Sequence, residues 1–264
     1  MSNHRALQMF GRSGNPALNA DTFGNSAKSS PAGIQFKSSE TMTLEGTVNK
    51  TGILLALVVL SASWTWNMFF ESGNPATVMP IAIGGAIAGF IFALVTIFKK
   101  QWAGTTAPLY AIAEGLFLGA ISGIFEMQYP GIVIQAVGLT LGTLASLLFL
   151  YKTGIVKPTE NFRLMITSAT MGIGMLYLVS MLMNMFGSGG IGFIHSNGLF
   201  GIGFSLFVVA IAALNLVLDF DFIEQGSEMG APKYMEWFGA FSLMVTLIWL
   251  YLEMLRLLAK LRSR

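Results

Sequence analysis

Three carboxyl groups follow a long apolar run in the stretch 214–225, which reads L-N-L-V-L-D-F-D-F-I-E-Q. Asp219, Asp221 and Glu224 come after about twenty mainly apolar residues, a length that spans a membrane as a helix. A carboxylate at or inside the hydrocarbon boundary is strongly unfavourable unless it is protonated, paired or wetted. These side chains are therefore candidates for an ion or proton path.

Helical geometry separates these acids onto two faces. Positions three or four apart share a face, so Asn215 lies with Asp219, and Asp221 lies with Glu224. Asp219 and Asp221 point about 200 degrees apart and cannot face one cavity. The alternative interpretation is a solvated, acidic helix end. Against it, no Lys or Arg occurs between Asp219 and Lys233, although cytoplasmic helix ends usually carry positive charge.

Two further acids lie within apolar segments. Glu114 lies near the middle of the segment 105–125, which makes it the most deeply placed acid by position. It is either a protonated group packed against a neighbouring helix or a cavity-facing group whose charge responds to pH. Glu253 precedes Arg256 by three residues, so we expect a surface or interfacial ion pair there.

Known catalytic patterns are missing from the sequence. No histidine lies in an apolar segment to act as a base, and neither G-x-S-x-G nor H-E-x-x-H occurs. An aspartate dyad would need acids on two helices, whereas Asp219 and Asp221 share one. The chain has no cysteine and two histidines, His4 and His195, which leaves little scope for a metal site. We expect no enzymatic activity, no cofactor and no resident metal.

The elements that must position these residues are membrane helices. Hydrophobic residues make up 54% of 264 positions and charged residues 11%, whereas soluble proteins carry about a quarter charged residues. Each spanning segment must satisfy its own backbone amides in lipid, so every segment should be a helix. We predict an all-α integral membrane protein, a seven-transmembrane-helix bundle in a lipid bilayer, with a flexible tail at 1–45 and a membrane domain at 46–264. The apolar segments are 52–70, 76–98, 105–125, 130–151, 164–186, 199–218 and 237–255.

Glycine spacing predicts where these helices approach closely. Small residues four apart let two helix backbones come together in a membrane. The pairs with this spacing are Gly85 and Gly89, Gly115 and Gly119, Gly119 and Gly123, and Gly138 and Gly142. The net charge of +2 comes with no run of basic and aromatic residues, so we expect no nucleic-acid binding.

Basic residues predict the orientation in the membrane. Lysine and arginine lie in the tail and after the second, fourth and sixth segments, and none lies after the first, third or fifth. Since basic loops stay inside, the N-terminus should be cytoplasmic. Seven full crossings would then put the basic C-terminal residues outside, against the rule. Either the last two segments form a re-entrant pair, or the seventh crosses because the other loops determine the topology.

Three motifs carry a resemblance to a known family: A-E-G-L-F-L-G at 113–119, L-D-F-D-F-I-E at 218–224 and L-Y-L-E-M-L-R-L-L at 250–258. With the seven segments, they make residues 45–262 similar to the transmembrane Bax-inhibitor-motif family, in particular its bacterial branch. The resemblance implies a seven-helix bundle with the last helix at its centre. It also implies a pH-sensitive calcium leak controlled by one aspartate on the sixth helix and one on the seventh.

The first of these aspartates maps onto Asp219. The second position falls on Thr246, which cannot ionise, so Asp221, Glu114 or Glu253 would have to supply a second acid. Some bacterial members of the family are understood as modulators of a membrane-bound protease, which involves protein contact.

Two functions follow as hypotheses. The leading one is a pH-sensitive leak for calcium or another cation, gated by the acidic cluster of the sixth helix, with Asp219, Asp221, Glu114 and Glu224 in the ion path or pH sensor. Its location would be the bacterial inner membrane. The rival is a non-conducting regulator that binds a membrane protease or another partner through its tail and tail-side loops.

Overall fold

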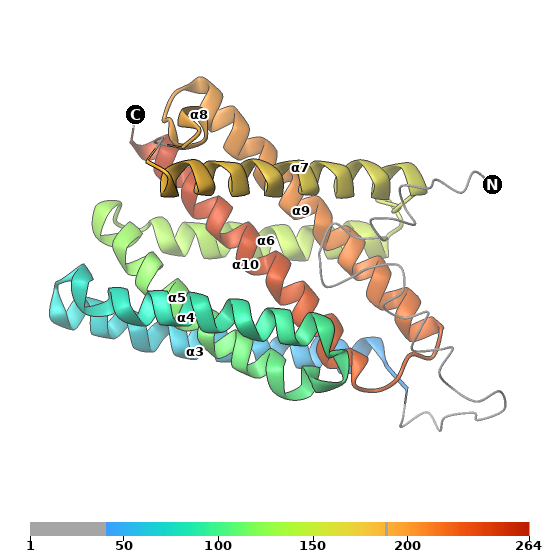
Figure 1. Ribbon diagram of the computed structural model, residues 1–264. Coiled ribbons are helices and arrows are strands. Elements are labelled where there is room, and N and C mark those ends of the chain that lie inside the picture. Colours follow the sequence, from blue (N-terminus) through green and yellow to red (C-terminus); the bar gives the residue numbers. More distant parts are fainter. Residues whose placement is uncertain (1–40, 188–189, 264) are drawn as a thin grey trace. The chain divides into compact units, whose positions relative to one another are not determined.

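The structure is a computed structural model that describes residues 41–187 and 190–263 (Figure 1). Each of the long helices in this part of the chain is long and apolar enough to cross a membrane, which confirms the all-α, seven-span prediction. A short 3-10 helix, η1 (Lys100–Trp102), precedes α5, and a short helix, α8 (Gly192–His195), precedes α9. The long helices are α3 (Leu44–Ser72), α4 (Pro75–Phe98), α5 (Ala103–Gln128), α6 (Ile132–Lys152), α7 (Glu160–Met185), α9 (Leu199–Glu228) and α10 (Met235–Arg262).

The last two long helices extend beyond their predicted ends. α9 continues past residue 218 to Glu228, and α10 runs from Met235 to Arg262. They contain 30 and 28 residues, so they are about 45 and 42 Å long at 1.5 Å per residue, against a hydrocarbon core of about 30 Å. Both helices are continuous and long enough to cross a membrane, as expected for seven full crossings.

Local capping explains where several helices begin. The Thr43 side chain accepts a hydrogen bond from the Gly46 amide at the start of α3, and Asn74 accepts one from Ala76 at the start of α4. Thr159 caps α7 in the same way by accepting from Phe162. A side-chain oxygen at this position satisfies a backbone amide that has no partner inside the helix. These caps allow short turns between long apolar helices.

Two compact units make up the described chain. The N-terminal unit comprises residues 41–130 and 223–245, and the C-terminal unit comprises 131–222 and 246–263. α9 and α10 each contribute to both units, with α9 dividing after Phe222 and α10 dividing before Thr246. The acids on these two helices are therefore divided between the units: Asp219, Asp221 and Glu253 belong to the C-terminal unit, and the others belong to the N-terminal unit.

Close helix packing builds the N-terminal unit, in which α5 packs against α3 and α4 (Figure 1). A Cβ on Gly85 would lie 2.6 Å from the carbonyl oxygen of Ala113, and one on Gly119 would overlap the carbonyl of Ala62. A side chain at either position would force the helices apart. The small-residue prediction is confirmed for α4 and α5.

The same prediction is wrong for α6. A Cβ on Gly138 or Gly142 would meet nothing within 4 Å, and both residues are exposed. Glycine spacing identifies a smooth helix face, but it does not tell whether a neighbouring helix lies against that face.

In the C-terminal unit, α7 and α9 share an apolar core. Ile166 and Ile173 of α7 pack with Val208, Ile211 and Leu218 of α9, and Trp249 of α10 packs against this cluster. The short helix α8 lies beside the C-terminal end of α10 (Figure 1). Buried polar residues occur among these apolar ones along the same helices: Thr167 lies between the two isoleucines of α7, and Asn215 lies between Ile211 and Leu218 of α9.

Candidate functional site

Asp219 is a buried carboxyl group between α9 and α10. Its side chain is on α9 and the residue is 0% exposed. The Thr246 hydroxyl of α10 donates a hydrogen bond of 2.6 Å to Asp219 Oδ2, and Thr246 is itself buried. The structure thus places Thr246 at the position opposite Asp219, where the resemblance implies a second aspartate. It also rules out the solvated helix end as the environment of Asp219.

Asp221 points to a different helix. The guanidinium of Arg163, near the start of α7, lies 2.6 Å from Asp221 Oδ2, and both side chains are only about one-seventh exposed. The sequence offered no basic residue near this acid along α9, because its partner is 58 positions away in the chain. The two aspartates therefore have separate neighbours, as the helical geometry predicted.

Glu114 and Glu224 lie in the N-terminal unit. Both are half-buried, and Glu224 is in the final turns of α9. Glu114 lies against α4, where a Cβ on Gly89 would be 2.7 Å from Glu114 Oε1. The expectation that Glu114 is the most deeply placed acid is wrong, since Asp219, Glu236 and Glu253 are almost completely buried. Depth along a helix does not determine burial, because the face that carries the residue also matters.

A second polar contact lies one helical turn from Asp219 on α9. Asn215 Nδ2 donates a hydrogen bond of 2.7 Å to Thr170 of α7. Asn215 Oδ1 and the Thr167 hydroxyl are buried, and neither has a hydrogen-bond partner in the described part of the chain. Buried polar atoms are nearly always hydrogen-bonded, so orphaned ones mark places where water or an ion can bind.

Glu253 forms a third polar contact, farther along α10. Its Oε1 accepts hydrogen bonds from Arg256, at 2.7 Å, and from the Tyr177 hydroxyl of α7, at 3.0 Å. The predicted pair with Arg256 is confirmed, but it is not a surface pair, because Glu253 is 1% exposed. Its other oxygen, Oε2, is buried and has no partner within the described residues.

These contacts follow one face of α10, which we call the polar stripe: Thr246, Glu253 and Lys260. The three residues are seven apart, or two helical turns and about 10 Å, and each is at most 5% exposed. The apolar cluster of α7 and α9, which includes Leu218 beside Asp219, packs against Trp249 of α10. Buried polar groups and an apolar cluster thus occur together among α7, α9 and α10.

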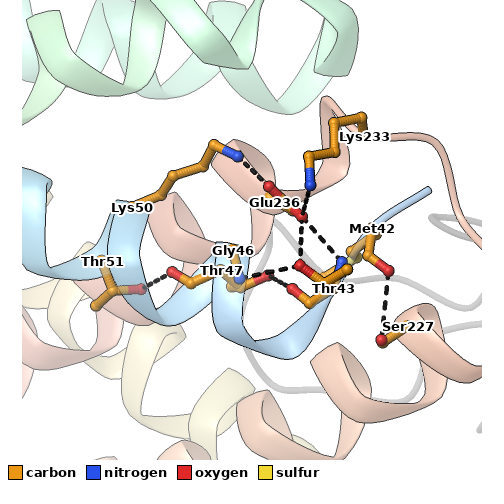
Figure 2. Close-up of polar contacts among 9 residues, drawn as sticks. All are labelled: Met42, Thr43, Gly46, Thr47, Lys50, Thr51, Ser227, Lys233 and Glu236. Carbon is orange, nitrogen blue, oxygen red and sulfur yellow. Dashed lines mark hydrogen bonds and ion pairs between the residues drawn. The ribbon is translucent and has the colours of Figure 1, made fainter. Parts of the chain in front are cut away.

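The N-terminal unit contains an ionic cluster that sequence reasoning missed (Figure 2). Glu236, in the first turn of α10, is 0% exposed and accepts hydrogen bonds from the Thr43 amide, at 2.9 Å, and hydroxyl, at 2.8 Å. Lys233 lies 2.8 Å from it, and Lys50 of α3 forms a second ion pair. A Cβ on Gly46 would overlap the carboxylate. The cluster joins the start of α10 to the start of α3.

No three His, Cys, Asp or Glu side chains come close enough to hold a metal ion in the portion of the chain that the structure describes. What the fold and the site define is an integral membrane protein of seven spanning helices, with buried charged and polar groups between α7, α9 and α10.

A comparison with protein families identifies the family to which this membrane protein belongs. The family described as Bax inhibitor 1 like matches residues 15–263, nearly the whole chain, and the protein belongs to that family. No curated protein and no solved structure gives a significant match. This match confirms the predicted resemblance at the level of the Bax-inhibitor family.

Proposed function

We propose that this protein is a pH-sensitive cation leak, with calcium as the expected ion, and that Asp219 is its pH-responsive gate. The observation that carries the proposal is the burial of the Asp219 carboxyl group on a membrane-spanning helix. Asp219 is 0% exposed, accepts a hydrogen bond from Thr246 and follows Leu218 of the apolar cluster. Intramembrane acids of this kind are retained at ion and proton paths, because burial is otherwise unfavourable.

Protonation would change the contact between α9 and α10 directly. The ionised carboxylate accepts the Thr246 hydroxyl proton in a charge-assisted hydrogen bond. A protonated carboxyl group loses that charge and gains a donor of its own, so the bond becomes an ordinary one. The difference is about 1–2 kcal/mol, enough to shift a closed–open equilibrium by about tenfold.

Buried polar groups along α9 and α10 support a route for ions. Asn215 and Asp219 lie one turn apart on α9, and Glu253 lies two turns beyond Thr246 on α10. Their carboxyl and amide oxygens are the hard ligands that Ca²⁺ prefers. In the closed state the apolar cluster that contains Ile173, Val208 and Ile211 excludes water. Opening requires these side chains to separate.

Orientation and location belong to the same proposal. Basic residues of the tail and of the connections after α4, α6 and α9 support a cytoplasmic N-terminus. The Asp219 end of the stripe would then be near the cytoplasm and the Lys260 end near the opposite face. The resemblance to bacterial family members supports the bacterial inner membrane and a non-enzymatic role.

Calcium-loaded vesicles containing the reconstituted protein test the function. We expect a leak whose rate depends on pH, and we expect Asp219→Asn to remove that dependence. Glu228→Gln is the matched control, because it deletes one negative charge from the exposed end of the same helix and should leave the pH profile unchanged. If Asp219→Asn conducts with the wild-type pH profile, the gating role is refuted.

The rival function, binding to a membrane protease or another partner, predicts another outcome of the same experiment. In that case wild-type vesicles show no leak at any pH, and deletion of residues 1–40 abolishes the partner interaction. The deletion ends at residue 40 because Met42 and Thr43 belong to the packed structure.

A further inference from the structure

Lys260 is a buried lysine at the far end of the polar stripe. It is 5% exposed, although it lies in the last turn of α10, two residues before Arg262. Its Nζ donates to three oxygens: the Ile194 carbonyl of α8 at 2.6 Å, the Gly201 carbonyl of α9 at 3.0 Å and the Ser205 hydroxyl of α9 at 2.8 Å. An ammonium group has three N–H donors, so all three are used.

The three receiving oxygens are all neutral. A buried ammonium group usually requires a carboxylate partner, because the charge loses its hydration. The acid on the same face of α10, Glu253, instead receives hydrogen bonds from Tyr177 and Arg256 at its Oε1. Two carbonyl oxygens and one hydroxyl oxygen thus surround the Lys260 ammonium, in the way that neutral oxygens surround a small bound cation. We call these three oxygens the oxygen cage.

Local structure holds the cage in place without Lys260. Ile194 is in the last turn of α8, where helix carbonyls have no intrahelical partner. A Cβ on Gly201 would overlap the carbonyl of Ser196, so glycine lets the segment after α8 lie against α9. The Ile191 amide donates to Ser180 of α7, which fastens the segment before α8. Contacts other than those of Lys260 therefore bring the cage oxygens together.

We propose that the oxygen cage is a binding site for a small monovalent cation of the ammonium type, and that Lys260 is its tethered occupant. Neutral oxygens favour a single charge over Ca²⁺, since a divalent ion needs carboxylates to replace its hydration. The proposal that the cage binds a cation depends only on the positions of its three oxygens, and not on the proposed leak. A second consequence rests on the proposed leak: the tethered ammonium closes that end of the polar stripe.

Chemical rescue tests the binding site in the full-length protein. Lys260→Ala removes the ammonium and leaves room in the cage, so the melting temperature should fall by several degrees. Methylammonium chloride should restore at least half of that loss, because it presents three N–H donors on a small cation. Tetramethylammonium chloride at equal ionic strength has the same charge without donors and should restore none. Equal effects of the two salts, or no effect of either, would overturn the proposal.

A second measurement, the rate of Lys260 acylation, tests the oxygen cage even if Lys260→Ala does not fold. Ser205→Ala keeps Lys260 and removes one cage oxygen, so Lys260 should be acylated several-fold faster by a soluble amine reagent, with exposed Lys157 as the internal reference. Thr140→Ala is the control, since that buried hydroxyl donates to the Ala136 carbonyl within α6 and has no part in holding the cage. Equal acylation of Lys260 in the two variants would contradict the cage.

Vesicle flux separates this inference from the proposed function. A Lys260→Ala leak that exceeds the wild-type leak and is inhibited by methylammonium supports both. Rescue of stability without any flux supports the cage and refutes the leak. A wild-type leak with no rescue supports the leak and refutes the cage.

Discussion

The hydrogen bond between Thr246 and Asp219 should depend on pH in a way that reveals the charge on Asp219. Thr246→Val keeps the branched shape and removes the hydroxyl that donates at 2.6 Å. A hydrogen bond to a charged group contributes about 1.5–3 kcal/mol, and a neutral one about 0.5–1.5 kcal/mol. The destabilisation should therefore be about 1 kcal/mol larger at a pH where Asp219 is ionised than at a pH where it is protonated.

A double-mutant cycle with Asp219→Asn isolates that interaction. Reversible unfolding in detergent, followed by tryptophan fluorescence, gives the coupling free energy between the two positions at each pH. We expect at least about 1.5 kcal/mol when Asp219 is charged, falling as the pH is lowered. Thr140→Val is the control, because that buried hydroxyl donates to Ala136 within its own helix and should give a pH-independent change. Additivity within about 0.5 kcal/mol at every pH would refute the reasoning.

Two other variants test the remaining ionic contacts. Glu236→Gln should lower the free energy of unfolding by about 1–3 kcal/mol, because Lys50 and Lys233 lose their common charged acceptor. The loss is limited because both lysines can reach water. Glu45→Gln is the control: Glu45 is an exposed acid in the first turn of α3, and its substitution should change the free energy of unfolding little. A change in Glu236→Gln no larger than that control would contradict the cluster. Tyr177→Phe should lower it by about 1–2 kcal/mol by removing the hydroxyl that joins Glu253 to Arg256, and calorimetry showing a neutral effect would contradict the contact.

Hydropathy was sufficient to predict the seven helices, because each must satisfy its own backbone in lipid. The ends of α9 and α10 were missed for a specific reason. Charged residues ended the apolar runs near residues 218 and 255, but Asp219, Asp221 and Arg256 have partners on other helices that let the helices continue. Those partners could not be found along one helix.

The site was predicted in part. The sequence singled out Asp219 by the apolar run before it, and the family resemblance singled out Thr246 as the position opposite, but the full burial of Asp219 and the hydrogen bond between them came from the structure. Arg163 and Lys260 were not predicted as members of the site, because each contacts residues more than fifty positions away. A signal for Lys260 was present in the seven-residue spacing of Thr246, Glu253 and Lys260, which puts three polar residues on one face of an otherwise apolar helix.

The central claim is that Asp219 changes protonation as the leak opens. Infrared difference spectra of wild type minus Asp219→Asn, recorded in lipid across a pH series, measure the carboxyl band of that one side chain. We expect a protonated-carboxyl band that appears over the same pH range in which calcium flux changes. A band that does not vary with pH, or that titrates outside that range, would contradict it.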